Sequence, residues 1–447
     1  MTNRPPPNWS RREFLEASAA AAGVSFVAQP FTFRKLAPSD TVRFGMVGIG
    51  MQGNGLLRTS IGLPGVVCAG AADLYDGRHT LAKEIAGATL PTTREYRRLL
   101  DDKTIDCIVA AVPDHWHKRM VVEAVSAGKD IYIEKPMSHS AADGVAMVDA
   151  VKKSGRILQV GSQRVSSQIC AKAKEMLAQG VLGEMTMIEG WLGRNDPTGA
   201  WEYPPPPDLS LRTLDWDTWQ NDVPKRPLDG NIFARWRCWK EYGTGVAGDL
   251  LVHLISGMMF MTGMNEPPKQ AASVGGIRRW KDGRNMPDVH ATIYYYGADN
   301  LPVYMRLNLG TEMPEQYRFQ GSKGVLEVSG NRLTFTPQSG EDNWPSYYTG
   351  SYPRALRDAY QQQWHKEHDW KVGQPVQLTE SVTFSSPDFD DTQPHLWNYF
   401  EAVRTRKPVV EDVVFGHNAA LACHMANEAY FRRTMVSWDE ATKTIKG

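Results

Sequence analysis

The sequence predicts an α/β protein of two domains, with a parallel sheet in its N-terminal half. Short apolar strands alternate with helical segments between residues 41 and 162, and a glycine-rich turn separates the first strand from the first helix. Longer alternating strands follow in the second half. The 447 residues are 42% hydrophobic and 22% charged, which suits a globular chain and excludes a disordered, collagen-like or coiled-coil one.

Charge and cysteine usage exclude several classes of protein. Fifty basic residues balance fifty acidic ones, so bulk charge does not favour a nucleic-acid partner. No apolar run reaches the ~18 residues that a membrane-spanning helix needs, and no transmembrane span is predicted. The five cysteines are scattered without a CxxC pair, which predicts buried thiols and neither a zinc ribbon nor a disulfide framework.

The first thirty residues predict a twin-arginine export signal. Arg11 and Arg12 stand in the run Ser-Arg-Arg-Glu-Phe-Leu, and an Ala-rich, weakly apolar stretch follows over residues 17–28. The alternative is an amphipathic helix with an incidental arginine pair. Cleavage stays open, because residues 26–28 match a small-x-small site poorly. We therefore expect a signal and linker over residues 1–40 and an exported, periplasmic protein.

The first strand of the mature chain runs directly into a phosphate-binding turn. Residues 41–47 are β-branched and apolar, and a helix is expected from Asn54 to Ser60. The turn between them is GxGxxG, with residues Gly48, Gly50, Met51, Gln52 and Gly53. Its glycines permit the tight turn, the approach of a pyrophosphate and close packing of the helix, whose N-terminal N–H groups face the phosphates. The pattern predicts a dinucleotide-binding domain of the Rossmann type.

The second strand identifies the dinucleotide. Residues 66–72 form an apolar run that ends in Asp73, 20 residues beyond Gly53. An acid in this position binds the adenosine ribose hydroxyls and repels a 2′-phosphate, so NAD is favoured over NADP. Arg78 lies close in sequence and could bind a 2′-phosphate, so NADP stays the less favoured alternative. A periplasm offers little free nicotinamide cofactor, so an exported protein of this kind would carry its NAD tightly bound.

Further strands place polar side chains at one edge of the same sheet. We expect strands at residues 105–112, 130–133 and 157–160. Ligands bind beyond the carboxyl ends of parallel strands, so residues just past these ends converge on one crevice. The candidates there for cofactor or substrate contact are Pro113, His115, His117, Glu134, Lys135 and Arg164. Asp114, His115 and His117 are close in sequence, but a catalytic zinc ion needs three converging ligands and an open fourth position, and no metal site is predicted.

The second half contains an acid and a histidine on one helix face. Asp249 and His253 are spaced i, i+4 after a glycine-rich approach that begins at Tyr242. Taken alone, such a pair is more often structural. Residues 291–296, 303–307 and 324–328 predict sheet strands, and residues 339–349 and 351–375 predict loops with an inserted helix. Residues 395–403 and 416–433 predict amphipathic helices.

The order of these motifs resembles a known family. GxGxxG, Asp73, Glu134-Lys135-Pro136, Asp249 and His253 are similar to the motifs of the glucose-fructose oxidoreductase / inositol dehydrogenase (Gfo/Idh/MocA) family, over nearly the whole chain from about Val42. The resemblance implies a Rossmann domain at 41–162, an α+β substrate and oligomerisation domain at 163–390 with a large, mostly antiparallel open sheet, and closing helices at 391–447. It also implies a homo-oligomer, a dimer or tetramer.

The resemblance further implies hydride transfer between NAD(P) and a ring CH–OH group of a sugar, glycoside or cyclitol. The base should titrate near neutral pH, which favours His253. Asp249 would orient His253 or bind a hydroxyl, and Lys135 would hold the reacting oxygen or share the proton relay. His117 resembles a family position near the nicotinamide, and Glu134 would support Lys135 or the cofactor.

Residues 191–242 bear on the substrate. Six of the fourteen tryptophans lie in this segment, and aromatic faces suit the C–H faces of sugars. Most of these rings are expected to pin a long insertion to the core. One or two of the rings are expected to contact the sugar substrate. The candidate substrate-binding residues are Trp191 and Tyr242, together with Arg164.

Two other functions compete with the dehydrogenase. Some relatives are NAD-dependent glycosidases that oxidise a ring carbon transiently, eliminate the glycosidic oxygen, add water and reduce the carbon again. They tend to depart from Glu-Lys-Pro, which this chain keeps at residues 134–136. A non-catalytic binding protein on the same scaffold is the third class, and the joint presence of Lys135, Asp249 and His253 argues against it.

Overall fold

The computed structural model describes residues 36–37, 40–338, 347–367, 381–386 and 391–447. The predicted export signal lies outside the described residues, as does most of the loop predicted at 339–349. In the described part of the chain, no helix combines the length and hydropathy that crossing a membrane requires. The thiols of all five cysteines are free, and four of the five residues are buried as predicted, whereas Cys68 is partly exposed.

The N-terminal domain is built on a six-stranded sheet in which every pairing is parallel. The strand order is that of a doubly wound dinucleotide fold: β3 (Thr92–Thr93), β2 (Val66–Ala72), β1 (Val42–Val47), β4 (Cys107–Ala110), β5 (Asp130–Glu134) and β6 (Leu158–Gly161). Its helices are α2 (Met51–Ile61), α3 (Asp76–Ala86), α4 (Arg97–Asp101), α5 (His117–Ser126) and α6 (Ala141–Ser154). All five strands predicted here are present, because fully buried parallel strands read as continuous apolar runs.

The second domain contains a ten-stranded sheet that is antiparallel except where β7 meets β10. In spatial order its strands are β14 (Val382–Ser385), β13 (Arg332–Pro337), β12 (Gly324–Ser329), β11 (Met313–Gly321), β7 (Met185–Gly193), β10 (Leu301–Asn308), β9 (Val289–Tyr296), β8 (Gln270–Gly276), β15 (Val436–Asp439) and β16 (Thr444–Lys446). The mostly antiparallel sheet that the family resemblance implied is therefore present.

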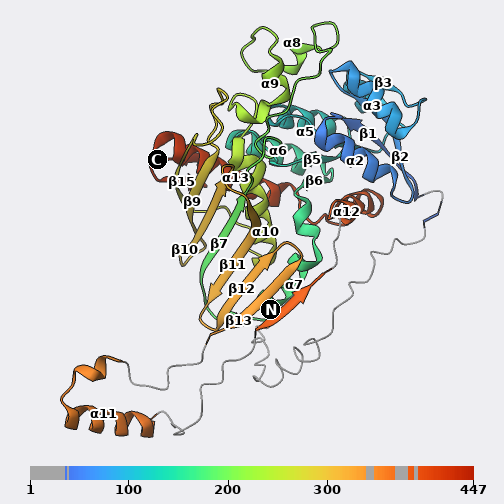
Figure 1. The fold of residues 1–447 in the computed structure, drawn as a ribbon. Helices are drawn as coiled ribbons and strands as arrows, with labels where there is room; N and C mark the ends of the chain where they lie inside the picture. Colours follow the sequence, from blue (N-terminus) through green and yellow to red (C-terminus); the bar gives the residue numbers. More distant parts are fainter. Residues whose placement is uncertain (1–35, 38–39, 339–346, 368–380, 387–390) are drawn as a thin grey trace.

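Helices cover one face of this sheet and join it to the first domain. They are α7 (Gln168–Ala178), α10 (Val252–Thr262) and α13 (Val413–Arg432), while α12 (Thr392–Thr405) packs on α2 (Figure 1). The amphipathic pattern expected for α13 is wrong, because the helix is buried around most of its surface between the two domains. The C-terminal region also adds β15 and β16 to the sheet, where only helices were expected. α11 (Arg354–Glu367) lies apart from the body of the protein (Figure 1).

A long irregular segment of the second domain crosses back over the first domain. We call residues 204–235 the strap; it contains α8 (Trp216–Trp219) and α9 (Gly230–Ala234) and lies at the top of Figure 1. Main-chain contacts tie it to the end of β2. The N–H of Asp76 donates to the carbonyl of Thr213 at 2.9 Å, and the N–H of Asp215 donates to the carbonyl of Leu74 at 3.1 Å. A buried aromatic cluster, which includes Trp219, fills the space beneath it.

Buried histidines make the fold sensitive to acid. Burial lowers the pKa of His290, His395 and His417 to about 4 and that of His424 to about 3. Between pH 6.5 and about 4 these histidines are therefore protonated in the unfolded chain but not in the folded chain. The free energy of unfolding falls as the pH falls through this range. Each such histidine contributes a slope of about 1.4 kcal/mol per pH unit in that window.

We expect the urea midpoint of unfolding to drop steeply between pH 7 and pH 5. His290→Gln removes one titrating group from the core and should reduce this slope by about 1.4 kcal/mol per pH unit. A midpoint that stays constant from pH 7 to pH 5 would contradict the assignment of these histidines as neutral.

Candidate active site

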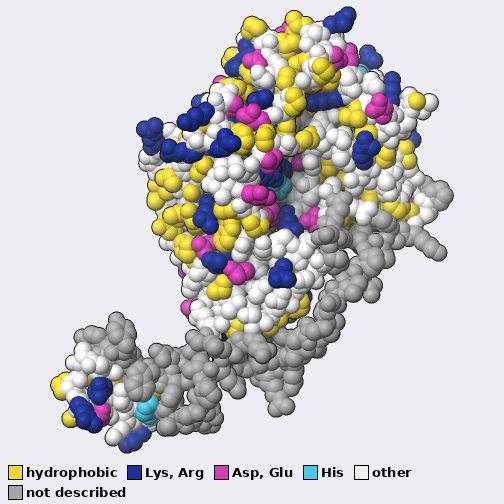
Figure 2. Space-filling view, viewed as in Figure 1, with side chains coloured by type: hydrophobic (Ala, Val, Ile, Leu, Met, Phe, Trp, Pro, Cys, Tyr) yellow, Lys and Arg dark blue, Asp and Glu magenta, His cyan; other side chains and the backbone are white. Residues whose placement is uncertain are grey.

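A cavity of about 630 Å³ opens between the two domains, below the strap. Its walls come from the glycine turn and the ends of β4 and β5 on one side, and from the strap and the start of α10 on the other. On the face drawn in Figure 2, acidic, basic and histidine side chains gather in a hollow at mid-height. A second cavity of about 60 Å³ lies beside it at the ends of β1, β2 and β4. In a doubly wound sheet this is the edge where ligands bind.

The glycine turn has the backbone geometry of a phosphate cradle. Gly48 has φ +80°, and a Cβ there would lie 2.4 Å from the carbonyl oxygen of Ala111. A Cβ on Gly53 would lie 2.0 Å from the carbonyl oxygen of Gly48. Gly50 caps α2 in an extended conformation without a side-chain hydrogen bond, so the first N–H groups of the helix are left for an anion. Gly50, Met51 and Gln52 line the large cavity, whereas Gly53 acts through packing.

The adenosine end of the crevice fits NAD. Asp73 lines the small cavity, and its carboxylate accepts hydrogen bonds from the N–H groups of Ile49 at 2.8 Å and Tyr75 at 3.0 Å. Arg78 pairs with Asp73 at 3.4 Å and lies over the ring of Phe233 at 5.1 Å. Since the guanidinium is already balanced, Arg78 does not supply a free charge for a 2′-phosphate.

Lys135, Asp249 and Arg237 form a buried charge cluster at the centre of the large cavity. The Lys135 ammonium donates to the Asp249 main-chain carbonyl at 2.7 Å and to its Oδ1 at 2.9 Å. Arg237 Nε donates to the same Oδ1 at 2.9 Å. Burial alone would raise the pKa of Asp249, but the two cations outweigh it and lower the pKa far below the usual range. An ammonium has three N–H donors, so Lys135 keeps one for a substrate oxygen.

Asp249 belongs to a turn of π-helix, Ala247–Leu251, and His253 to the α-helix α10 that follows. Both side chains line the cavity as the i, i+4 spacing predicts. Such wide turns within helices occur frequently at functional sites. Gly248 makes this turn possible, because a Cβ there would lie 1.7 Å from Thr244 Oγ1.

His253 differs from expectation in its titration. Burial first, and then the charge of Lys135, lower its pKa to about 3, so it does not titrate near neutral pH. No described residue forms a hydrogen bond with its ring, and the imidazole faces the cavity neutral and able to accept a proton. The residue type suggested a pKa near 6.5; the buried, cation-rich surroundings decide otherwise.

Glu134 supports the cofactor side of the cavity. Its Oε1 accepts hydrogen bonds from Gln52 Nε2 at 3.2 Å and Gln163 Nε2 at 2.9 Å, and its Oε2 accepts one from the N–H of Lys135 at 3.3 Å. Burial raises the pKa of Glu134 against the opposing charge of Lys135. Gln52 thereby links the glycine turn to the lysine motif.

The two predicted cofactor histidines lie beside the cavities rather than in them. His115 faces the main-chain carbonyls of Tyr242 and Trp219 at 3.2 and 2.9 Å, and so connects the strap to the first domain. His117 is fully buried between the carbonyls of Pro136 at 2.8 Å and Val112 at 2.9 Å. Both orient the segments that line the site, and Pro113 lines both cavities directly.

None of the three residues predicted to bind substrate is among those that line the two cavities. Trp191 projects from the uncovered face of the sheet, with the guanidiniums of Arg306 and Arg318 over its ring. Arg164 is engaged by Glu315 and Asp391, both at 3.3 Å. Tyr242 is buried in the aromatic cluster beneath the strap. These side chains contact neighbouring strands and the core, and their assignment as substrate-binding residues stays a prediction.

Other residues of the same segment line the cavity in their place. They are Arg194, Trp201, Tyr203, Trp219, Phe233, Trp236 and Arg237. The many aromatic residues of the segment 191–242 predicted that this segment contacts the substrate. They did not predict which of its residues line the cavity. Arg237, which binds Asp249, had no signal in the sequence, because the pairing depends on where the strap returns to the core.

The fold and the site together define a dinucleotide-binding domain of oxidoreductase type. Residues 42–162 match the family model GFO_IDH_MocA, described as "Oxidoreductase family, NAD-binding Rossmann fold". Residues 42–162 are therefore similar to the NAD-binding Rossmann domain that this family model describes.

Relatives named as dehydrogenases match about a third of the chain. Inositol 2-dehydrogenase/D-chiro-inositol 3-dehydrogenase of Lactiplantibacillus plantarum is 30% identical over 156 residues, which are 34% of this chain and 45% of that protein. Levoglucosan dehydrogenase of Pseudarthrobacter phenanthrenivorans is 27% identical over 173 residues, 38% of this chain and 37% of that protein. The chain thus matches less than half the length of these relatives.

Solved structures resemble the chain over both domains. A levoglucosan dehydrogenase in complex with NADH and levoglucosan superposes with a TM-score of 0.64 at 17% identity, over 89% of this chain and 99% of that one. GenD2 from gentamicin A biosynthesis, in complex with NAD, superposes with a TM-score of 0.64 at 14% identity, over 91% of this chain and 99% of that one. At these identities the likeness establishes the fold.

Proposed function

We propose that the chain is an NAD-dependent oxidoreductase that transfers a hydride between a ring CH–OH group of a sugar, glycoside or cyclitol and a tightly bound cofactor. One observation carries the proposal: Lys135, Asp249 and His253, drawn from two domains, line one cavity whose opposite wall is the glycine turn. The dehydrogenases among the relatives act on substrates of this class.

Each residue has a role in this chemistry. When bound, the nicotinamide supplies the hydride acceptor. The free N–H of Lys135 holds the reacting oxygen and stabilises the negative charge that develops there. The neutral imidazole of His253 accepts the hydroxyl proton as the hydride leaves. Asp249 fixes Lys135, and Arg237 fixes Asp249.

Tight retention of the cofactor is supported by the strap. Trp219 lines both cavities, and its carbonyl accepts a hydrogen bond from Trp116 Nε1 at 2.9 Å. Arg212 of the strap accepts through its carbonyl a hydrogen bond from Arg94 at 2.7 Å. A dinucleotide in the crevice would have to leave past this segment, so the strap slows its exchange.

Localisation and assembly are part of the same proposal. The arginine pair at residues 11–12 supports export of the folded protein, with its cofactor, through the twin-arginine pathway. The uncovered face of the ten-stranded sheet, where Trp191 lies between two arginines, supports a homo-oligomer packed through that face.

The test uses the full chain purified without added nucleotide. Heat release should yield NAD, and a panel of free sugars, cyclitols and aryl glycosides should include members that reduce the bound cofactor, seen as near-ultraviolet absorbance. Release of the aglycone without lasting reduction would favour the redox-neutral glycosidase instead. A protein that neither carries NAD nor binds it when added would overturn the proposal.

A further inference from the structure

One basic residue on the wall of the large cavity has no carboxylate to balance it. Four basic side chains line this cavity, those of Arg78, Lys135, Arg194 and Arg237. Asp73 pairs with Arg78 at 3.4 Å, and Asp249 pairs with both Lys135 and Arg237 at 2.9 Å. Across the described ranges, Arg194 forms no ion pair. Glu134 also lines the cavity, so its four cations face three carboxylates, those of Asp73, Glu134 and Asp249.

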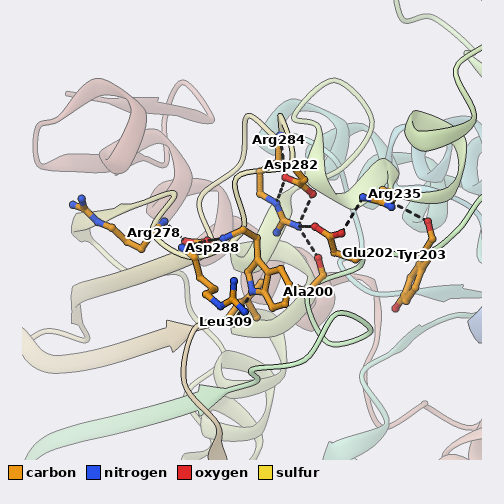
Figure 3. Close-up of polar contacts among 11 residues, drawn as sticks. Ala200, Glu202, Tyr203, Arg235, Arg278, Asp282, Arg284, Asp288 and Leu309 are labelled. Carbon is orange, nitrogen blue, oxygen red and sulfur yellow. Dashed lines mark hydrogen bonds and ion pairs between the residues drawn. The ribbon is translucent and has the colours of Figure 1, made fainter.

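The acidic residues closest to Arg194 in sequence are engaged elsewhere. Glu202 pairs with Arg235 at 3.1 Å and with Arg284 at 3.8 Å, and Arg284 in turn pairs with Asp282 at 2.8 Å (Figure 3). Asp196 is exposed, and its Oδ1 accepts a hydrogen bond from the N–H of Gly199 at 2.7 Å. The network in Figure 3 thus pairs Glu202 with other cations. The Asp196 carboxylate and the Arg194 side chain both adjoin Gly199, but within the described ranges the two form no ion pair.

Arg194 stands close to the reacting groups and among aromatic rings. It lines the same cavity as His253, and its charge is one of those that lower the pKa of that histidine. Trp201, Tyr203 and Trp236 form the neighbouring wall. The network of Figure 3 also fixes this wall, because Arg235 Nε donates to the carbonyl of Tyr203 at 3.0 Å.

We infer that the substrate is an anionic sugar, whose carboxylate or phosphate binds the guanidinium of Arg194 while its ring lies against the aromatic wall. The inference rests on the proposed function and names its substrate class. Guanidinium groups bind carboxylate and phosphate through paired, charge-assisted hydrogen bonds. Binding would also neutralise one cation near His253, and so raise the basicity of the imidazole when the hydroxyl proton has to be accepted.

The test compares ligands that differ only at C6. The full chain with its cofactor bound is titrated calorimetrically with D-glucose, D-glucuronate and D-glucose 6-phosphate, and with the corresponding galacto and manno series. For at least one ring configuration we expect an anionic member to bind about tenfold to a hundredfold more tightly than the neutral sugar. The uronate and phosphate arms identify which anion is preferred.

Arg194→Gln should abolish this preference, and Arg194→Lys should keep part of it. Arg98→Gln is the matched control, because Arg98 is exposed on α4 and lines neither cavity. Equal binding of neutral and anionic members by the unmodified protein, or a preference that persists in Arg194→Gln, overturns the inference. Anion binding that depends on Arg194 without any cofactor reduction supports the site but refutes the oxidoreductase.

Discussion

Lys135→Ala and His253→Ala are each expected to lower the rate of cofactor reduction by sugar by about two to four orders of magnitude. Lys135 provides an N–H near Asp249 for a substrate oxygen, and His253 provides the neutral acceptor for the proton. Single-turnover absorbance of the bound nicotinamide measures the effect. The content of bound NAD should stay unchanged, since the glycine turn and Asp73 hold the dinucleotide.

The variants are expected to fold. In Lys135→Ala, Asp249 keeps its pairing with Arg237 at 2.9 Å, so no buried carboxylate is left alone. Lys172→Ala is the control for loss of a lysine, because Lys172 pairs only with Glu175 on α7, away from the cavity. Unchanged turnover in both active-site variants would refute the site assignment.

The second large effect concerns retention of the cofactor. Trp219→Ala should raise the dissociation constant of NAD by about tenfold to a hundredfold and make the protein lose its cofactor on gel filtration. The physical reason is that the Trp219 side chain lines both cavities and is 4% exposed, so its removal opens the wall between the adenosine end and solvent. Nucleotide content of the eluted protein and the rate of NAD release report it.

Ile232→Ala is the matched control for this variant. Ile232 is also 4% exposed in the aromatic cluster beneath the strap but lines neither cavity. Both substitutions should cost stability, about 2–5 kcal/mol, so a difference in NAD content between them isolates the contact with the cofactor. Equal retention of NAD by the two proteins would show that the strap does not hold the dinucleotide.

The sequence by itself determined the first domain and its ligand-binding edge. Strand, glycine turn and helix follow one another within a few tens of residues. The local sequence therefore determines the geometry of β1, the turn at Gly48 and α2. The same holds for Asp73 at the end of β2 and Lys135 just after β5. In a parallel sheet the carboxyl ends of the strands face one crevice. Residues that each strand positions locally therefore meet at one site.

Only the tertiary structure decided the opposite wall. Lys135 and Asp249 are 114 residues apart, and Arg237 binds Asp249 from the short helix that follows the strap, a segment without periodic pattern. Trp191 lies on β7 and Trp201 on a turn beyond it, and composition could not tell which of the two rings would face the cavity, because that depends on how the segments pack. The low pKa of His253 arises in the same way, because burial and neighbouring cations exist only once distant segments pack together.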